Sequence, residues 1–305
     1  MVGNHNNTIQ NRMKLSGSEK SFYILTYNLL IMLSIIILFP LMHVFAQSLS
    51  DPMMVLSGRV MVWPIKPTFN TYVNILKSPS IMTGFANSLF YAVTGTAINI
   101  VMTIICAYPL SRRELWGCGP IMFIFTFTMM FGGGMIPTYL TIKSLGLIDT
   151  RWAMLLPGAM TVWNMIMART FFVSTIPLEL YESASIDGAT DLRVLYSIVL
   201  PLSAPIIAVL VLLYAVSHWN SYFDAMMYLS TPSLFNIQLV LRNAITNLRT
   251  LMDNDGNLSN LTSSMAVGEA AKYTIIVIAM VPVLIVYPFV QKHFIKGIMI
   301  GSIKG

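Results

Sequence analysis

The amino-acid sequence predicts an all-α integral membrane protein with six transmembrane helices. Two observations on composition support this prediction: the 305 residues are 56% hydrophobic, and only 10% of them are charged. Soluble domains carry about 25% charged residues, and the mean hydropathy of +0.71 is that of an apolar chain. The third observation is that the apolar residues gather in segments of about 20, the length that spans the hydrocarbon core of a bilayer.

Six segments have the required length, and they lie at about 22–45, 81–108, 120–140, 152–172, 205–229 and 270–290. Arg12, Lys14 and Lys20 precede the first segment, as basic residues precede a signal peptide's apolar region. This segment is longer than such a region and no small-residue cleavage site follows it, so we expect it to remain as a span. The glycines 132–134 and Pro137 interrupt the third segment. Such a break is tolerated only where protein or a water-filled cavity receives the freed backbone groups.

The predicted organisation is an N-terminal cytoplasmic tail, residues 1–20, followed by a single transmembrane domain, residues 21–305. Residues 46–80 are rich in proline and should form an irregular loop with short helices at most, and residues 230–268 should form a polar loop. Six spans place both termini on one side, which the positive-inside rule assigns to the cytoplasm. Lys and Arg divide about ten to eight between the two sides, so charge alone gives this orientation only a small margin.

The most polar stretch between two long apolar segments covers residues 177–201. It predicts two short helices separated by a turn, because capping residues, a glycine and further capping residues follow one another along it. Apolar residues on one face should anchor the second helix, and a proline should end it. In order, these residues are Ser174 or Thr175 as first cap with Pro177 in the first turn, Gly188 at the turn, Thr190 or Asp191 as second cap, the anchors Leu195, Ile198, Val199 and Leu202, and Pro201 at the end.

The spacing within this stretch resembles the EAA loop of the membrane subunits of bacterial ABC importers. Glu182-Ser183-Ala184 is followed after three residues by Gly188, and after nine more by Ile198-Val199-Leu200-Pro201. Ser183 stands where the family usually has alanine, which exchanges one small residue for another. Asp187-Gly188-Ala189 is the form seen in carbohydrate importers of the maltose type. The resemblance covers about residue 20 to the end, and the segments 131–139, 163–164, 169–172, 218–222 and 296–305 are similar to one branch that serves complex oligosaccharides.

The resemblance implies the type I ABC importer permease fold, with a cytoplasmic coupling loop at residues 174–203, in a bacterial cell membrane. It implies as partners a second, homologous permease subunit, two ATP-binding subunits and an extracytoplasmic solute-binding protein. The substrate would be an oligosaccharide and not a monosaccharide, and uronic-acid-containing chains are one candidate class. The chain has no Walker A sequence, so ATP and Mg²⁺ would bind to partner subunits and this chain would hold no cofactor. The expected ATPase-coupling residues are Glu182, Ser183, Ala184, Asp187, Gly188, Ala189, Ile198, Leu200 and Pro201.

A second group of residues is expected to line a pore, because sugars bind to aromatic rings and to planar hydrogen-bonding groups. The candidates, which lie in or near the ends of predicted spans, are Asn87, Trp163, Asn164, Trp219, Asn220, Tyr222 and Asp224. Polar side chains in membrane helices also form interhelical hydrogen bonds, and Trp and Tyr often anchor a span at the membrane surface. Asp224 is the only acid inside a predicted span, and it suits gating or a solvated position as well as a substrate contact.

Two other classes of protein are alternatives. A secondary transporter or channel would have ionisable residues in several spans and inverted repeats, and the spans here are almost uncharged. A membrane enzyme would need a nucleophile and base or a set of metal ligands, and the four scattered histidines give no such pattern. The net charge of +6 suits basic loops beside anionic lipid, and no basic cluster with interleaved aromatics indicates nucleic-acid binding.

Overall fold

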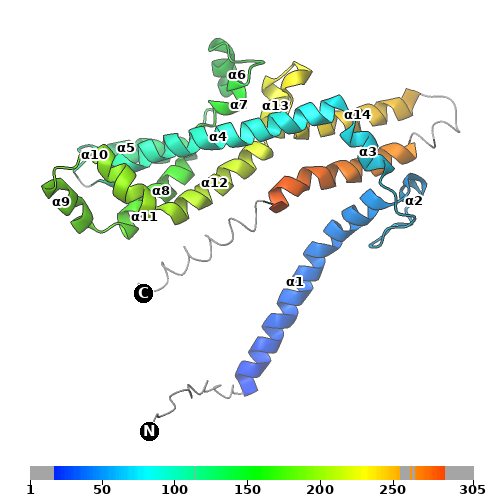
Figure 1. The fold of residues 1–305 in the computed structure, drawn as a ribbon, viewed down its shortest axis with the longest axis horizontal. Helices are drawn as coiled ribbons and strands as arrows, with labels where there is room; N and C mark the ends of the chain where they lie inside the picture. The colour runs from blue at the N-terminus through cyan, green and yellow to red at the C-terminus, as the bar shows by residue number, and fades with distance from the viewer. Residues whose placement is uncertain (1–16, 113, 255–261, 263–264, 286–305) are drawn as a thin grey trace, which may run out of the picture.

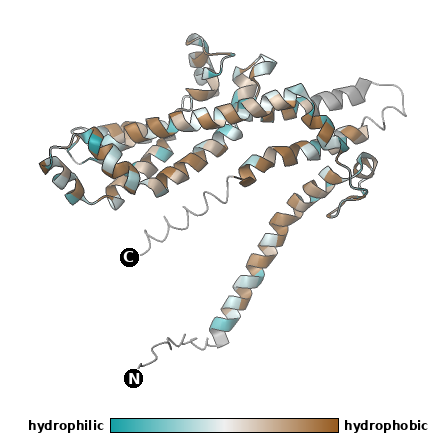
Figure 2. Ribbon diagram, viewed as in Figure 1, coloured by the Kyte–Doolittle hydropathy of each residue, from teal (hydrophilic) through white to brown (hydrophobic). Residues whose placement is uncertain are grey.

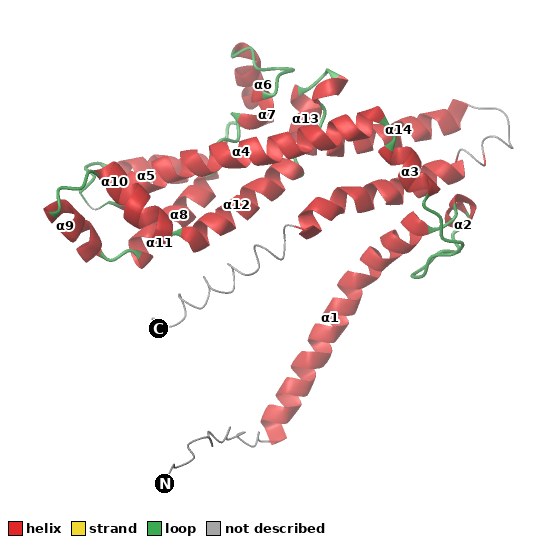
Figure 3. Cartoon of the chain, in the orientation of Figure 1, coloured by secondary structure: helices red, strands yellow, loops and turns green. Residues whose placement is uncertain are grey.

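A computed structural model describes residues 17–112, 114–254, 262 and 265–285, and this part of the chain consists of helices joined by loops and turns (Figures 1 and 3). The longest element of the bundle is α4 (Pro79–Ser111), the second predicted span. Three other helices pack along α4: α8 (Val162–Thr175), α12 (Ala204–Trp219) and α14 (Ile237–Asn254). The bundle is therefore organised around α4, which runs the length of the molecule (Figure 1).

The first predicted span is confirmed as α1 (Gly17–Leu49), a long helix that diverges from the bundle (Figure 1). Most of α1 is hydrophobic (Figure 2), its apolar side chains are almost all exposed, and only 6% of its most apolar window is buried within this chain. The following loop contains only the short helices α2 (Pro52–Leu56) and α3 (Asn70–Leu76), as the prolines predict. Lipid or another subunit must cover α1, because an apolar surface of this size is not stable in water.

The third predicted span is broken where the sequence predicts. Helices α5 (Cys118–Met130) and α6 (Met135–Ser144) meet at an angle of 112°. Gly134 has a φ of +86°, a conformation that favours glycine. The turn after α6 is held at Asp149, which accepts hydrogen bonds from the backbone N–H groups of Ser230 and Thr231, both 2.8 Å long, and from the Thr231 hydroxyl. These bonds join the loop after α6 to the loop that precedes α14, and they lower the pKa of Asp149.

The fourth predicted span, 152–172, is not one continuous helix. A short helix, α7 (Trp152–Leu155), is followed by an irregular segment before α8 begins. Pro157 and Gly158 explain the break, since proline cannot donate the helical hydrogen bond and glycine weakens a helix. The freed carbonyl of Gly158 accepts a hydrogen bond from Asn99 on α4, 2.8 Å long. With 14 residues, α8 is about 21 Å long and shorter than the hydrocarbon core.

The fifth predicted span, 205–229, divides into α12 and α13 (Tyr222–Tyr228), with the break at Asn220 and Ser221. The short 3₁₀ helix η2 (Pro232–Leu234) follows. The prediction of a polar loop at 230–268 is wrong over Ile237–Asn254, because these residues form helix α14. The sixth span is confirmed over the helix Met265–Ile285, and its last expected residues, 286–290, lie outside the described part of the chain.

Among the described residues, three helices are long and apolar enough to cross a membrane, and five spans result if each of two bent pairs counts as one. Buried polar side chains on α4 and α12 bind to one another and hold the two helices together. Thr103 and Tyr214 share a hydroxyl–hydroxyl bond of 2.7 Å, and Asn99 lies 3.3 Å from His218 Nε2. Gly95 makes room for the His218 ring, because a Cβ there would lie 2.4 Å from Nε2. Close packing and satisfied polar groups therefore fix the position of α12 on α4.

Candidate coupling element and translocation cavity

Residues 177–203 form the two-helix element that the sequence predicts, at one end of α4 (Figure 1). The first helix, α9 (Leu178–Ile186), follows Pro177, which is in an extended conformation, and no side chain caps it. The prediction that Ser174 or Thr175 caps it is wrong, because α8 continues through Thr175 and the Ser174 hydroxyl bonds back to Phe171. Proline at this position needs no donor, since the first N–H groups of a helix have no partner within it.

The turn after α9 is confirmed at Gly188, which has a φ of +68°. Two hydrogen bonds close it: Gly188 N–H donates to the Ser185 carbonyl over 3.1 Å, and Ala189 N–H donates to the Ala184 carbonyl over 2.9 Å. Thr190 then caps α10 (Asp191–Val194) by accepting the Arg193 N–H over 3.4 Å. The glycine thus ends one helix where the threonine starts the next, which is the usual division between these residue types.

The element has a buried inner face and an exposed outer face. Ala184, Val194, Leu195 and Val199 belong to the main hydrophobic cluster, with Val199 fully buried. Of the other predicted anchors, Ile198 is half-buried, whereas Leu202 is exposed and does not act as one. The outer face carries Glu182, Ser183, Asp187 and exposed apolar side chains, which are Ile186, Leu192 and Tyr196. Leu200 is half-buried and Pro201 is exposed.

Pro201 does not end the second helix. The chain passes from α10 through one π-helical turn (Leu195–Val199) into α11 (Leu200–Leu202), and the bend of 81° to α12 comes at Ser203. In the π turn, Leu200 N–H donates to the carbonyl of Leu195. Pro201 has no N–H to continue the regular pattern, and its ring displaces the preceding carbonyls, which accounts for the wider turn.

Arg112, the residue that follows α4, contacts the element at residues 177–203 and holds it against the bundle. Its guanidinium lies 4.1 Å from the centre of the Tyr181 ring and 4.0 Å from an Asp191 carboxylate oxygen. Its Nε also donates to Glu114 over 3.2 Å, while Tyr108 on α4 donates to the Asp191 carbonyl over 3.2 Å. Burial raises the pKa of the Tyr181 phenol, and the nearby guanidinium opposes that rise. The sequence shows Arg112 as a basic loop residue, but nothing in it indicates the contact with Tyr181.

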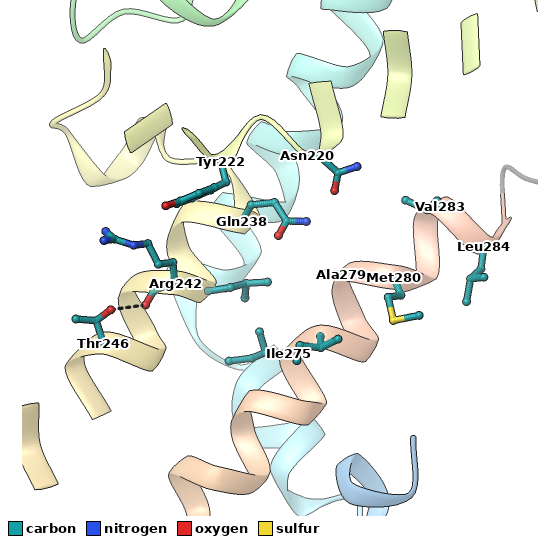
Figure 4. Close-up of a pocket in the computed structure, with 12 residues that line it drawn as sticks. Asn220, Tyr222, Gln238, Arg242, Thr246, Ile275, Ala279, Met280, Val283 and Leu284 are labelled. Carbon is teal, nitrogen blue, oxygen red and sulfur yellow. Dashed lines mark hydrogen bonds between the residues drawn. The ribbon is translucent and has the colours of Figure 1, made fainter. Parts of the chain in front are cut away.

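A cavity of about 700 Å³ lies between α14, the helix Met265–Ile285 and the start of α13 (Figure 4). It is toward the opposite end of the bundle from the coupling element (Figure 1). One wall carries polar side chains from Asn220, Tyr222, Gln238, Arg242 and Thr246. The facing wall is apolar and consists of Ile275, Ile276, Ala279, Met280, Val283 and Leu284. Sugars have both hydroxyl groups and apolar C–H faces, so two such walls suit them.

The structure brings only some of the predicted pore residues to this cavity. Asn220 and Tyr222 line it. Asp224 is exposed on α13 but is not among the lining residues, and Trp163 is exposed beside a separate cavity of about 420 Å³. Gln238, Arg242 and Thr246 are not among the predicted residues, because their segment was predicted to be a polar loop. Their spacing of four residues is the signal that would have placed them on one helical face.

The remaining predicted pore residues are buried between helices. Trp219 is 4% exposed, donates its Nε1–H to the Ala279 carbonyl over 3.1 Å and packs edge to face with Phe85. Asn87 donates to the carbonyls of Ser233 and Phe235. Asn164 is buried on α8. In this conformation Trp219 and Asn87 make packing contacts and interhelical hydrogen bonds. This is the alternative to pore lining that the sequence left open.

The helical bundle, with the coupling element at one end and the cavity toward the other, has the fold of an ABC importer permease. It superposes with a TM-score of 0.82 and 35% identity, over 92% of this chain and 99% of the other, on a chain of the solved structure described as a bacterial ABC transporter involved in the import of the acidic polysaccharide alginate. Residues 99–300 match the family described as "Binding-protein-dependent transport system inner membrane component". The chain belongs to this family.

Curated relatives from Bacillus subtilis (strain 168) agree with this assignment. The "Polygalacturonan/rhamnogalacturonan transport system permease protein YtcP" is 42% identical over 288 residues, which cover 94% of this chain and 99% of that protein. "Protein LplC" is 39% identical over 270 residues, covering 88% and 90%. The chain is thus a permease subunit of an ABC importer, and the alternatives of a secondary transporter, a channel or a membrane enzyme no longer apply.

Proposed function

We propose that this permease carries uronic-acid-containing oligosaccharides into the cytoplasm, paired with a second permease and driven by two ATPase subunits. An extracytoplasmic solute-binding protein delivers the sugar, and both termini of the chain lie in the cytoplasm. The names of YtcP and of the alginate importer refer to acidic polysaccharides, which favours this class of substrate. ATP and Mg²⁺ bind to the ATPase subunits.

The main observation in support of the proposal is that α12 connects the element at residues 177–203 to the cavity. Its first residue, Ala204, follows the bend after the coupling element, and the residue after its last is Asn220, in the cavity wall. The coupling element is fixed at its base by buried residues and is exposed on its outer face. A push on α9 therefore moves α12 and a wall of the cavity together, as alternating access requires.

The outer face of the element has the composition of a docking surface. Arg112, Tyr181, Glu182 and Ile186 border a groove of about 1040 Å³ beside α9. Ile186 and Leu192 both border this groove and are 87% and 67% exposed, and exposed apolar side chains gathered in one place mark an interaction site. Glu182 is exposed next to it and is free to pair with a basic residue of the ATPase.

The proposal is tested by uptake into liposomes that contain the assembled importer, ATP inside and the loaded solute-binding protein outside. Uptake of a labelled oligogalacturonate should require ATP, the ATPase subunits and this permease. A binding assay of the co-encoded solute-binding protein against a panel of glycans identifies the sugar independently. Uptake by this chain without any ATPase, or a binding protein that takes no oligosaccharide, would contradict the proposal.

A further inference from the structure

Helix α14 presents three polar residues to the cavity at regular intervals. Gln238, Arg242 and Thr246 follow one another at four-residue spacing, and all three line the cavity (Figure 4). Each step rises about 6 Å along the helix, so the three side chains form a row along one helical face. The Thr246 hydroxyl donates to the Arg242 carbonyl over 3.0 Å. The side of α14 that packs against α4 is apolar, with Ile237 and Leu241 buried.

Arg242 gives this cavity a positive charge. It is the only charged residue among the described residues that line the cavity, and no carboxylate of the described chain lies within ion-pairing distance of it. Its guanidinium lies 6.0 Å from the centre of the Tyr222 ring, at the limit of a cation–π contact. The side chain is exposed and lies beside Tyr222 at the edge of the cavity away from the helix Met265–Ile285 (Figure 4), so the charge is available to a ligand at that edge.

We infer that Arg242 binds the carboxylate of a uronic acid unit as the oligosaccharide passes through the permease. This inference rests on the proposed function and adds the residue that distinguishes acidic from neutral sugars. A guanidinium binds a carboxylate through two parallel hydrogen bonds, which a hydroxymethyl group cannot replace. Gln238 and Asn220 offer donors and acceptors for ring hydroxyls, and the apolar wall at Ile275 and Ala279 faces the C–H side of the sugar.

A single charged contact suits passage better than tight binding would. Transport requires a site that is favourable enough to enter and weak enough to leave. One arginine in an open, partly apolar cavity meets both conditions, whereas a cluster of cations would retain an oligouronate. Repetition of polar groups along α14 also lets a chain of sugars advance from one position to the next.

The test compares Arg242→Gln and Arg242→Lys with the unmodified importer, in liposomes with the loaded solute-binding protein outside. The substrates are a labelled oligogalacturonate and its neutral methyl ester. We expect Arg242→Gln to lower uptake of the acid about tenfold and to leave uptake of the ester unchanged, while Arg242→Lys retains at least half of the acid uptake. Arg59→Gln is the matched control, because Arg59 is an exposed arginine on the loop after α2 and does not line the cavity.

Each other result counts against the inference. Equal loss for acid and ester, or loss of co-purifying subunits, would give Arg242 a structural role or a role in subunit contact. Unchanged uptake of the acid would show that Arg242 does not meet it. Where the unmodified importer does not carry the ester, equal loss in the lysine and glutamine variants overturns the inference. An unmodified importer that carries no acidic oligosaccharide refutes the proposed function, whereas one that carries the acid equally well with Arg242→Gln refutes this inference alone.

Discussion

Gly188 shapes the turn between α9 and α10 through its backbone alone. A Cβ at this position would meet no heavy atom within 4 Å, so space does not require glycine. The φ of +68° does, because this conformation costs other residues roughly 1–2 kcal/mol. We expect Gly188→Val to displace α9, so that ATP hydrolysis continues while sugar uptake falls at least tenfold. The measurement is the ratio of sugar imported to ATP hydrolysed in liposomes.

Gly188→Asn is the matched control for the valine variant. Asparagine tolerates positive φ better than β-branched residues do, so we expect it to keep most of the uptake. Normal coupling in the valine variant would show that the angle of this turn does not matter. Equal loss in both variants would point instead to a contact made by the glycine surface.

Glu182 is exposed on α9 and should become buried when the ATPase docks. Loss of one partner from a desolvated ion pair costs about 3–5 kcal/mol. Glu182→Ala should therefore reduce the amount of ATPase that co-purifies with the permease by well over tenfold in dilute detergent solution. Glu179→Ala removes an exposed acid from the same helix outside the motif and should have little effect. ATPase recovery that stays equal to that of the unmodified complex would exclude this ion pair.

At the scale of elements, Arg112 is the link that holds α9 on the end of α4. Its ion pairs involve exposed carboxylates and contribute little, whereas its contact with the Tyr181 ring is partly desolvated. Such a cation–π contact contributes about 1 kcal/mol. We expect Arg112→Gln to loosen α9 and to lower the amount of sugar imported per ATP about fivefold, with the ATPase still bound.

Substitutions of Tyr181 separate this role from a general effect of charge. Tyr181→Phe keeps the ring and should behave as the unmodified protein, while Tyr181→Leu should resemble Arg112→Gln. The double variant Arg112→Gln with Tyr181→Leu should be no worse than either single variant, because both remove the same contact. Additive losses would mean that the two residues act separately.

Local signals in the sequence predicted the turn and the second cap within residues 177–203. Gly188 and Thr190 determine a turn and a cap through their own neighbours, so no knowledge of the fold is needed. The contact between Arg112 and Tyr181 joins residues far apart in the chain, and only the packed structure creates it. The cap of α9 was misplaced because α8 continues through Thr175, and helix ends that meet a buried neighbour follow packing rather than local preference.

Two longer elements differed from the prediction for related reasons. The continuous apolar run at 152–172 predicted one helix where the structure has α7 and α8. Pro157 and Gly158 interrupt it, and Asn99 donates a hydrogen bond to the carbonyl that the break leaves free. The polar composition of residues 237–254 also led to the prediction of a loop where the structure has α14. Its buried apolar residues Ile237 and Leu241 are four positions apart, which is a helical spacing. An amphipathic helix with polar residues facing a cavity has low mean hydropathy, so its period is the better signal.

At the scale of the whole molecule, α4 and α12 run from the coupling element to the cavity and are held together along their length. The buried pairs Thr103–Tyr214 and Asn99–His218 lie between them. Polar contacts of this kind contribute about 0.6 kcal/mol each in membrane proteins, yet they define one relative position of the two helices. The proposed displacement at α9 would therefore be transmitted by a rigid pair. Near its C-terminal end α1 packs on the helix Met265–Ile285 through Ala46, Ser48 and Ala270, and the rest of its apolar surface is exposed.

The orientation of the whole chain gives the last prediction. The coupling element and the loop after α2 lie at opposite ends of the molecule (Figure 1), so they should face opposite sides of the membrane. In a background without Cys106 and Cys118, we expect Ser57→Cys to react with a membrane-impermeant maleimide on intact cells. Ser185→Cys on α9 should react only after the cells are permeabilised. Both serines are exposed on this chain, so in cells that lack the ATPase subunits the accessibility of the introduced thiol depends on the membrane. Labelling of Ser185→Cys from outside would reverse the orientation and contradict the assignment of α9 to ATPase coupling.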